Sequence, residues 1–168
     1  MPWTAGSPEG ARHADHRRPS AITGPRPWVF LAGCVKDGLD GPWRRQVAEA
    51  VADRPGTLLD PERPDWDSSW RESIEDARFA EQVRWELSAQ ERADLVVMYF
   101  GAVSEAPISL LELGLFAPRA DGSRRGGELV VVCTEDYRRR GNVEVVCDRY
   151  GVPLLSSLDA LVERIRGL

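Results

Sequence analysis

Histidine is almost absent from this chain of 168 residues. Its two histidines, His13 and His16, both lie within the first 27 residues. The remaining sequence therefore excludes Ser-His and Cys-His nucleophilic pairs and any histidine-ligated metal site. Long apolar runs are missing too, because none approaches the ~20 residues of a membrane-spanning helix.

Cysteine and positive charge are also limited. The three cysteines, Cys34, Cys133 and Cys147, show no CxxC spacing. An odd number of cysteines in a chain without an apolar export signal indicates reduced thiols in the cytoplasm. The net charge is −5 and the pI is about 5.2, which is unsuited to a nucleic-acid polymer. We therefore expect a cytoplasmic protein that binds neither nucleic-acid polymers nor membranes.

The first 27 residues are rich in Pro, Gly, Ser, Ala and Arg and have no apolar period. This composition predicts a disordered tail over residues 1–27. Residues 28–168 are enough for one domain with its own core.

Apolar runs alternate with amphipathic segments throughout residues 28–168. Strands are predicted over residues 28–33, 56–60, 94–100, 128–133 and 152–156, and helices over residues 41–53, 76–93, 104–114, 141–151 and 158–168. This alternation predicts an α/β fold: a single flavodoxin-like doubly wound domain, with a five-stranded parallel sheet and helices on both faces. Right-handed crossovers then bring the loops after the first three strands to one edge, where ligands of such sheets bind.

The segment SEAPISLLELG, Ser104 to Gly114, places the carboxylate of Glu112 between Leu111 and Leu113. Ser109 and Glu112 fit a capping box, in which the serine caps the helix and the glutamate bonds back to it. The same first-turn position would let the helix macrodipole favour the anion. A carboxylate anion at the ligand-binding edge could attack an electrophilic carbon, such as the anomeric carbon of a sugar. The spacing leaves both interpretations open.

Several segments together resemble the nucleoside 2-deoxyribosyltransferase-like family: FLAG, LLDPERPDWDSSW, RFAEQVRWEL, ADLVVMYF, APISLLELGLF and GNVEVVCDRYG. The most specific pattern is [Ser/Thr]-x-x-Glu-Leu-Gly, present here as SLLELG. The resemblance implies that Glu112 attacks C1′ of a (deoxy)nucleoside or nucleotide and forms a covalent glycosyl-enzyme, which a second base or water then resolves. It also implies a homo-oligomer, a dimer or larger. No metal or redox cofactor is needed for this chemistry.

The resemblance indicates the substrate pocket less specifically. Gly33 and Cys34 would line the sugar and base pocket, although many family members have tyrosine or serine near Cys34. Asp60, Asp65 and Asp67 compete for contact with the base, and Asp60 fits a plain turn equally well.

Further substrate contacts are assigned by the same resemblance. Gly101 and Ser109 complete the expected pocket. Trp66 and Trp70 would either stack on a base or cover the core. Asn142 would either reach a neighbouring subunit's sugar or act as a helix N-cap. The loop that begins at Gly101 lacks the family's usual aspartate, and the chain ends in RGL without the C-terminal aromatic residue of classical members.

The helix predicted over residues 76–93 carries Phe79, Val83 and Leu87 at a core-facing spacing. Trp85 should then point away from this stripe, towards an oligomer interface or a wide internal helix face.

The sequence is compatible with three functions. The first is an N-glycosyl transferase or hydrolase. The second is a non-catalytic nucleotide-binding module with the same fold, and the third is a scaffold in which Glu112 only caps a helix. Only the enzyme would exchange or release the base of a nucleoside, so this assay distinguishes the first function from the other two.

Overall fold

A computed structural model describes residues 4–5, 22–35, 39–63, 69–119 and 127–168. Its centre is a parallel sheet in the order β1-β3-β2-β4-β5-β6. The strands are β1 Thr4–Ala5, β2 Trp28–Gly33, β3 Thr57–Leu59, β4 Leu95–Phe100, β5 Glu128–Cys133 and β6 Leu154–Leu155. The helices are α1 Trp43–Ala50, α2 Ala77–Arg92, α3 Pro107–Phe116, η1 Ala117–Arg119, α4 Arg140–Tyr150 and α5 Leu158–Arg166.

The predicted flavodoxin-like fold is confirmed. The strands from β2 to β6 follow the doubly wound order 2-1-3-4-5 when counted along the chain. β1 adds a two-residue strand beside β3, at the outer edge of the five strands that the sequence predicts.

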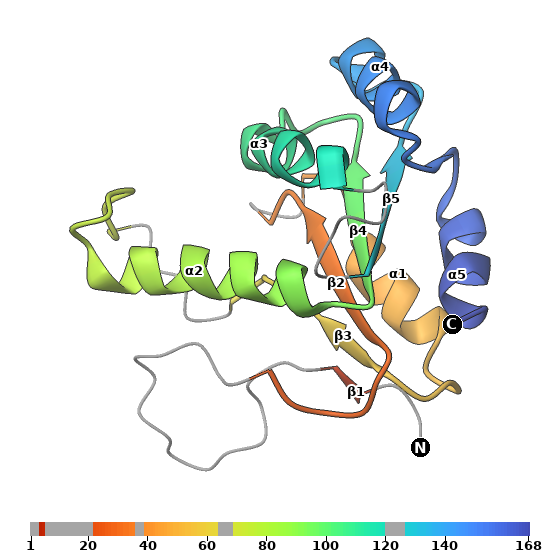
Figure 1. The fold of residues 1–168 in the computed structure, drawn as a ribbon, viewed down its shortest axis with the longest axis horizontal. Helices are drawn as coiled ribbons and strands as arrows, with labels where there is room; N and C mark the ends of the chain where they lie inside the picture. The colour runs from red at the N-terminus through yellow and green to blue at the C-terminus, as the bar shows by residue number, and fades with distance from the viewer. Residues whose placement is uncertain (1–3, 6–21, 36–38, 64–68, 120–126) are drawn as a thin grey trace.

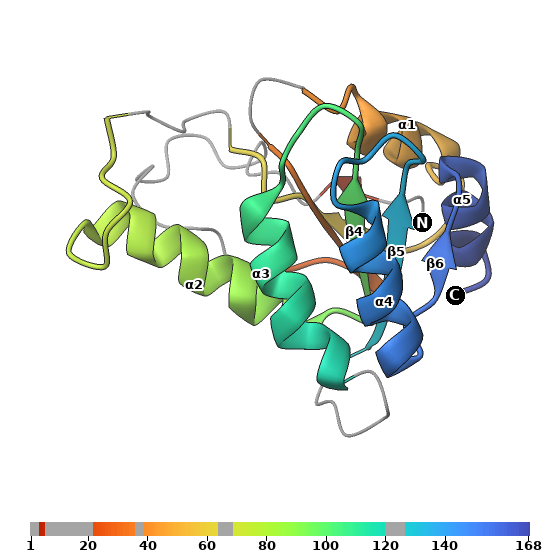
Figure 2. The same ribbon diagram turned by 90° about the horizontal axis from the view of Figure 1, so that it is seen from above.

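Helices cover both faces of the sheet (Figures 1 and 2). On one face, α2, α3 and α4 pack against strand residues such as Phe30 and Met98. On the other, α1 and α5 pack against residues such as Leu31 and Val97. All six residues of β4 are buried, which explains its continuous apolar sequence.

The start of α3 corrects the capping-box interpretation. The residue that precedes the helix is Ala106, whose φ of 42° is left-handed, and Pro107 occupies the first helical position. Ser109 is therefore the third helical residue and Glu112 the sixth. Glu112 lies in the second turn, beyond the first turn in which the macrodipole acts.

The inner face of α2 also differs from the prediction. Gln82, Ala89 and Gln90 are buried, whereas Val83 is 36% exposed. Trp85 is partly buried against the core, with its ring 6.2 Å from the ring of Phe30. Trp85 therefore packs on a wide internal helix face, as one of the two interpretations predicted, and the interpretation that it points outward is wrong.

The segment that precedes β2 packs on the domain. Ile22 contacts the core. The indole N–H of Trp28 donates to the carbonyl of Gly24, and the Thr57 hydroxyl donates to the carbonyl of Pro25. The rest of the predicted tail, residues 1–3 and 6–21, lies outside the described residues. Within the described ranges, every helix is too short or too polar to cross a membrane.

Candidate active site

The crevice of this fold lies between β2 and β4, which pair in the centre of the sheet. The chain leaves β2 towards one edge and β4 towards the other, so the loops that follow these two strands separate at this point. Gly33 ends β2 opposite Tyr99 of β4. Its φ of 154° and the short approach of Tyr99 O, 3.1 Å from an added Cβ, favour glycine.

Glu112 is the most unusual acid on the α2–α3 side of the sheet. Its side chain is only 8% exposed, and its Oε1 accepts a hydrogen bond of 2.5 Å from Nε2 of Gln90 on α2. Burial raises the pKa of Glu112 to about 7; the Gln90 hydrogen bond opposes this shift and the charge of Glu86 adds to it. The expectation that the macrodipole stabilises the anion is therefore corrected: burial dominates, and Glu112 is only partly ionised near pH 7.

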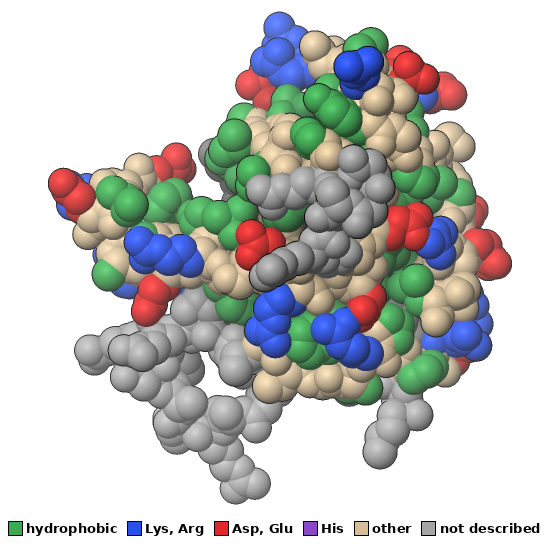
Figure 3. Space-filling model, in the orientation of Figure 1, with side chains coloured by type: hydrophobic (Ala, Val, Ile, Leu, Met, Phe, Trp, Pro, Cys, Tyr) green, Lys and Arg blue, Asp and Glu red, His purple; other side chains and the backbone are tan. Residues whose placement is uncertain are grey.

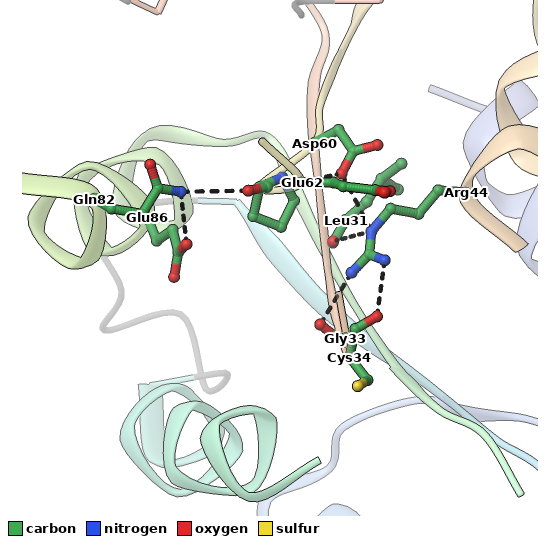
Figure 4. Close-up of polar contacts among 9 residues, drawn as sticks. Leu31, Gly33, Cys34, Arg44, Asp60, Glu62, Gln82 and Glu86 are labelled. Atoms are coloured by element: carbon green, nitrogen blue, oxygen red, sulfur yellow. Dashed lines mark hydrogen bonds and ion pairs between the residues drawn. The ribbon is translucent and has the colours of Figure 1, made fainter. Parts of the chain in front are cut away.

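Glu86 is a second carboxylate of this region, and the sequence interpretation missed it. It is half-buried on α2, and its Oε1 accepts a 2.7 Å hydrogen bond from Nε2 of Gln82 (Figure 4). Burial raises the pKa of Glu86 as well. Gln82, Glu86 and Gln90 are spaced four residues apart, so they line one face of α2. That polar row is visible in the sequence, but the spacing of the apolar residues Phe79, Val83 and Leu87 predicts a different inner face.

Arg44 organises the loop that follows β2. This buried side chain donates to the carbonyls of Leu31, Gly33 and Cys34 at 3.1, 3.0 and 3.0 Å. It also forms an ion pair with Oδ1 of Asp60 at 3.3 Å, which joins the loops that follow β2 and β3 (Figure 4). Nothing in the sequence marks Arg44 as a buried residue, because a single arginine in an amphipathic helix is ordinarily exposed.

Asp60 is held in two ways. Besides the ion pair with Arg44, its Oδ1 accepts a hydrogen bond from the amide of Glu62 at 2.9 Å, as in a plain turn. Burial raises the pKa of Asp60, and the positive charge of Arg44 opposes that shift. These contacts give the Asp60 carboxylate a structural role, and base contact stays a prediction.

A cavity of about 600 Å³ lies beside Arg44 on the α1 side of the sheet. Cys34 and Asp60 are among its lining residues, and Leu31 and Leu58 supply apolar surface. Glu112 does not line it, because its helix packs on the opposite face, against α2. The predicted pocket residues Cys34 and Asp60 therefore lie by a cavity that does not include the predicted nucleophile.

The other predicted contacts are dispersed. Gly101 is buried next to the carboxylate of Asp40. Ser109 is buried on α3, three residues before Glu112. Asn142 is exposed as the third residue of α4; the N-cap is Arg139, so the N-cap interpretation of Asn142 is wrong.

The aromatic and acidic residues predicted after β3 are only partly described. The Trp70 ring contacts the guanidinium groups of Arg63 and Arg78, each 5.2 Å from the ring centroid. Asp65, Trp66 and Asp67 lie outside the described residues. Among the residues that are described, no cluster of three His, Cys, Asp or Glu side chains is arranged to hold a metal ion.

Comparison with known proteins identifies one family. Residues 26–137 match the family described as "nucleoside 2-deoxyribosyltransferase like". This match spans β2 to the loop before α4 and includes Glu86 and Glu112. No curated protein matches the chain.

Proposed function

The chain belongs to the nucleoside 2-deoxyribosyltransferase-like family, and we propose that it cleaves or transfers the N-glycosidic bond of a (deoxy)nucleoside or nucleotide. The observation that carries this proposal is the buried carboxylate of Glu112, within the SLLELG motif and hydrogen-bonded to Gln90. Gly33, Cys34 and Gly101 belong to the loops at the crevice and would contact the substrate there.

In the first step, the Glu112 carboxylate attacks C1′ of the sugar. The C1′–N bond breaks, its electron pair passes to the base nitrogen, and a glycosyl ester forms on Glu112. This attack requires Glu112 as the anion. The hydrogen bond from Gln90 favours that state, because its amide donates to the carboxylate.

The departing base needs a proton, and Glu86 is the group proposed to supply it. The Glu86 charge is one cause of the raised pKa of Glu112, and Glu112 releases its proton only near pH 7. The reactive form carries that proton on Glu86 and the negative charge on Glu112. A carboxyl with a raised pKa is suited to general acid catalysis near neutral pH.

In the second step, water or an acceptor base attacks C1′ and releases Glu112 as the carboxylate. The proton of the attacking nucleophile passes to Glu86, which restores the starting state. Two displacements at C1′ retain the anomeric configuration.

Incubation of the purified protein with purine and pyrimidine nucleosides and their 5′-monophosphates tests the proposal. Base release without an acceptor indicates hydrolysis, and a new nucleoside in the presence of a free base indicates transfer. Ligand binding without either product would instead favour the non-catalytic nucleotide-binding module.

We also propose a homo-oligomer that buries the outer face of α3. Ile108, Leu111 and Leu115 lie on this face and are 61%, 69% and 40% exposed. Figure 3 shows hydrophobic side chains gathered over α3, between charged groups on α2 and α4. A solvent-facing helix surface is ordinarily polar. In the proposed oligomer, this apolar stripe packs against the same stripe of a second copy across a two-fold axis. Asn142 would then lie near the neighbour's site.

Light scattering at micromolar concentration measures the assembly. Leu111→Glu should reduce the molar mass of the oligomer, whereas Val145→Glu should not, although Val145 on α4 is equally exposed at 69%. A monomeric wild-type protein would contradict the proposed assembly.

A further inference from the structure

Asp40 connects the two loops that flank the crevice. It lies at the end of the loop that follows β2, and its Oδ1 accepts hydrogen bonds from the amides of Val103 and Ser104 at 3.2 and 3.0 Å. Its Oδ2 accepts a 2.5 Å hydrogen bond from the Ser104 hydroxyl. One carboxylate therefore binds three donors of the loop between β4 and α3, and such charge-assisted bonds are stronger than neutral ones.

Gly101 allows this close approach. A Cβ at Gly101 would lie 2.3 Å from Cγ and 2.4 Å from Oδ1 of Asp40. Any larger residue at position 101 would therefore clash with the Asp40 carboxylate. The buried glycine thus leaves room for a carboxylate from a segment about 60 residues earlier in the chain. We refer to Asp40, Gly101, Val103 and Ser104 as the Asp40 bridge.

A second hydrogen bond holds the loop between β4 and α3. The Tyr137 hydroxyl, in the loop before α4, donates to the carbonyl of Glu105 at 2.9 Å. The loop then passes through the left-handed Ala106 and enters α3 at Pro107. Glu112 lies six positions after Ala106, within the continuous helix α3. The direction of the first turn consequently fixes where Glu112 lies against α2.

We propose that Asp40 is a positioning residue for Glu112. By binding the β4–α3 loop, it sets the direction of α3 and keeps the Glu112 carboxylate against Gln90. It also couples the loop after β2, which would contact the substrate, to the helix that carries the nucleophile. The role of Glu112 in this inference rests on the proposed function, whereas the placement of α3 does not.

Hydrogen exchange and carboxyl NMR of the full-length protein test the bridge without any substrate. In Asp40→Ala, the amides of Val103 and Ser104 should exchange at least about tenfold faster, because their acceptor is lost. The Glu112 carboxyl should then titrate below its value of about 7, towards the ordinary 4.5, as water reaches it. Asp40→Asn keeps an oxygen that accepts from both amides and should restore most of the wild-type behaviour.

Asp53→Ala is the matched control. Asp53 is also paired, through two hydrogen bonds from Arg166, but it follows the C-terminal end of α1, whereas Asp40 precedes the N-terminal end. Its loss should leave the exchange of residues 101–106 and the Glu112 titration unchanged. Wild-type exchange in Asp40→Ala, or a Glu112 titration that does not move, would overturn the positioning role.

Turnover gives a further, separable result. If the wild-type protein releases base, Asp40→Ala should lower kcat about tenfold or more with KM changed less than about threefold. An unchanged kcat would overturn the positioning role. If the wild-type protein releases no base from any substrate, the proposed function fails, and the NMR and exchange results still decide whether Asp40 places α3.

Discussion

Two acids, one on each side of the central strands, show how the partner of a carboxylate decides its role. Asp60 is half-buried and Glu112 is buried, and desolvation is the largest cause of the raised pKa in each case. Asp60 faces the guanidinium of Arg44, which offsets much of the penalty and ties two loops together. Glu112 faces an amide and a second carboxylate. Its charge is less well compensated, which suits a group that must change its charge during a reaction.

Replacement of Glu112 should have the largest effect on activity. Glu112→Gln removes the proposed nucleophile and should lower base release at least about a thousandfold. Activity close to that of the wild-type protein would contradict the covalent mechanism.

The same variant should be more stable than the wild-type protein at alkaline pH. The pKa of Glu112 is about 7 in the folded protein and near 4.5 when unfolded. Between these values the folded state keeps a proton that the unfolded state has lost, so stability falls as pH rises. At about pH 8 the gain of Glu112→Gln should be on the order of 3 kcal/mol. At about pH 4 it should vanish, and denaturant titrations at both pH values measure the difference.

Arg44→Met should turn Asp60 into an uncompensated acid. The variant leaves the half-buried Asp60 without its cation and removes the donor from three carbonyl groups. We expect a loss of about 3–5 kcal/mol in the free energy of unfolding. Adding Asp60→Asn should recover part of that loss, because the unpaired charge is then removed.

Arg45→Met provides the control for this measurement. The neighbouring Arg45 is exposed and lies 3.9 Å from Glu49, so its loss should cost less than about 1 kcal/mol. Equal losses in the Arg44 and Arg45 variants would show that the buried ion pair does not stabilise the loops.

Glu86→Gln should make Glu112 resemble an isolated acid. Removal of the like charge should lower the pKa of Glu112 below about 7. Base release should fall about a hundredfold, because the leaving base loses its proton donor. The decline in rate above about pH 7, expected of a pair that shares one proton, should disappear in this variant. A pH profile identical to that of the wild-type protein would exclude Glu86 as the acid.

The positions of the strands and helices were predictable because each rests on a local pattern. β4 is a continuous apolar run, and α4 ends at the left-handed Gly151 that the sequence indicates. The motif also located Glu112. The partners of these groups were not predictable: Gln90, Arg44 and Asp40 act on residues 10 to 64 positions away, and only the fold brings them together.

Errors arose where two local patterns competed. Ser109 and Glu112 have capping-box spacing, but Pro107 starts the helix two residues earlier. On α2, Phe79, Val83 and Leu87 suggested an apolar inner stripe, yet the row that contains Gln82 and Gln90 is the buried one. A polar inner row is unfavourable for a purely structural helix and is typical of a helix that lines a site.

Gln90→Leu should have the smallest effect and sharpens the contrast between the two acids. Gln90 is buried and donates a hydrogen bond to Glu112, whereas Arg44 forms an ion pair with Asp60. Loss of this donor should raise the pKa of Glu112 above about 7 and shift the shared proton from Glu86 towards Glu112. Base release should then fall several-fold, roughly the effect of one lost hydrogen bond to a charged group. Carboxyl NMR of Glu112 measures the shift, and Gln46→Leu, on the exposed side of α1, is the control. A pKa that moved downward would mean that Gln90 stabilises the protonated acid instead, and the anionic nucleophile would then need another source of stabilisation.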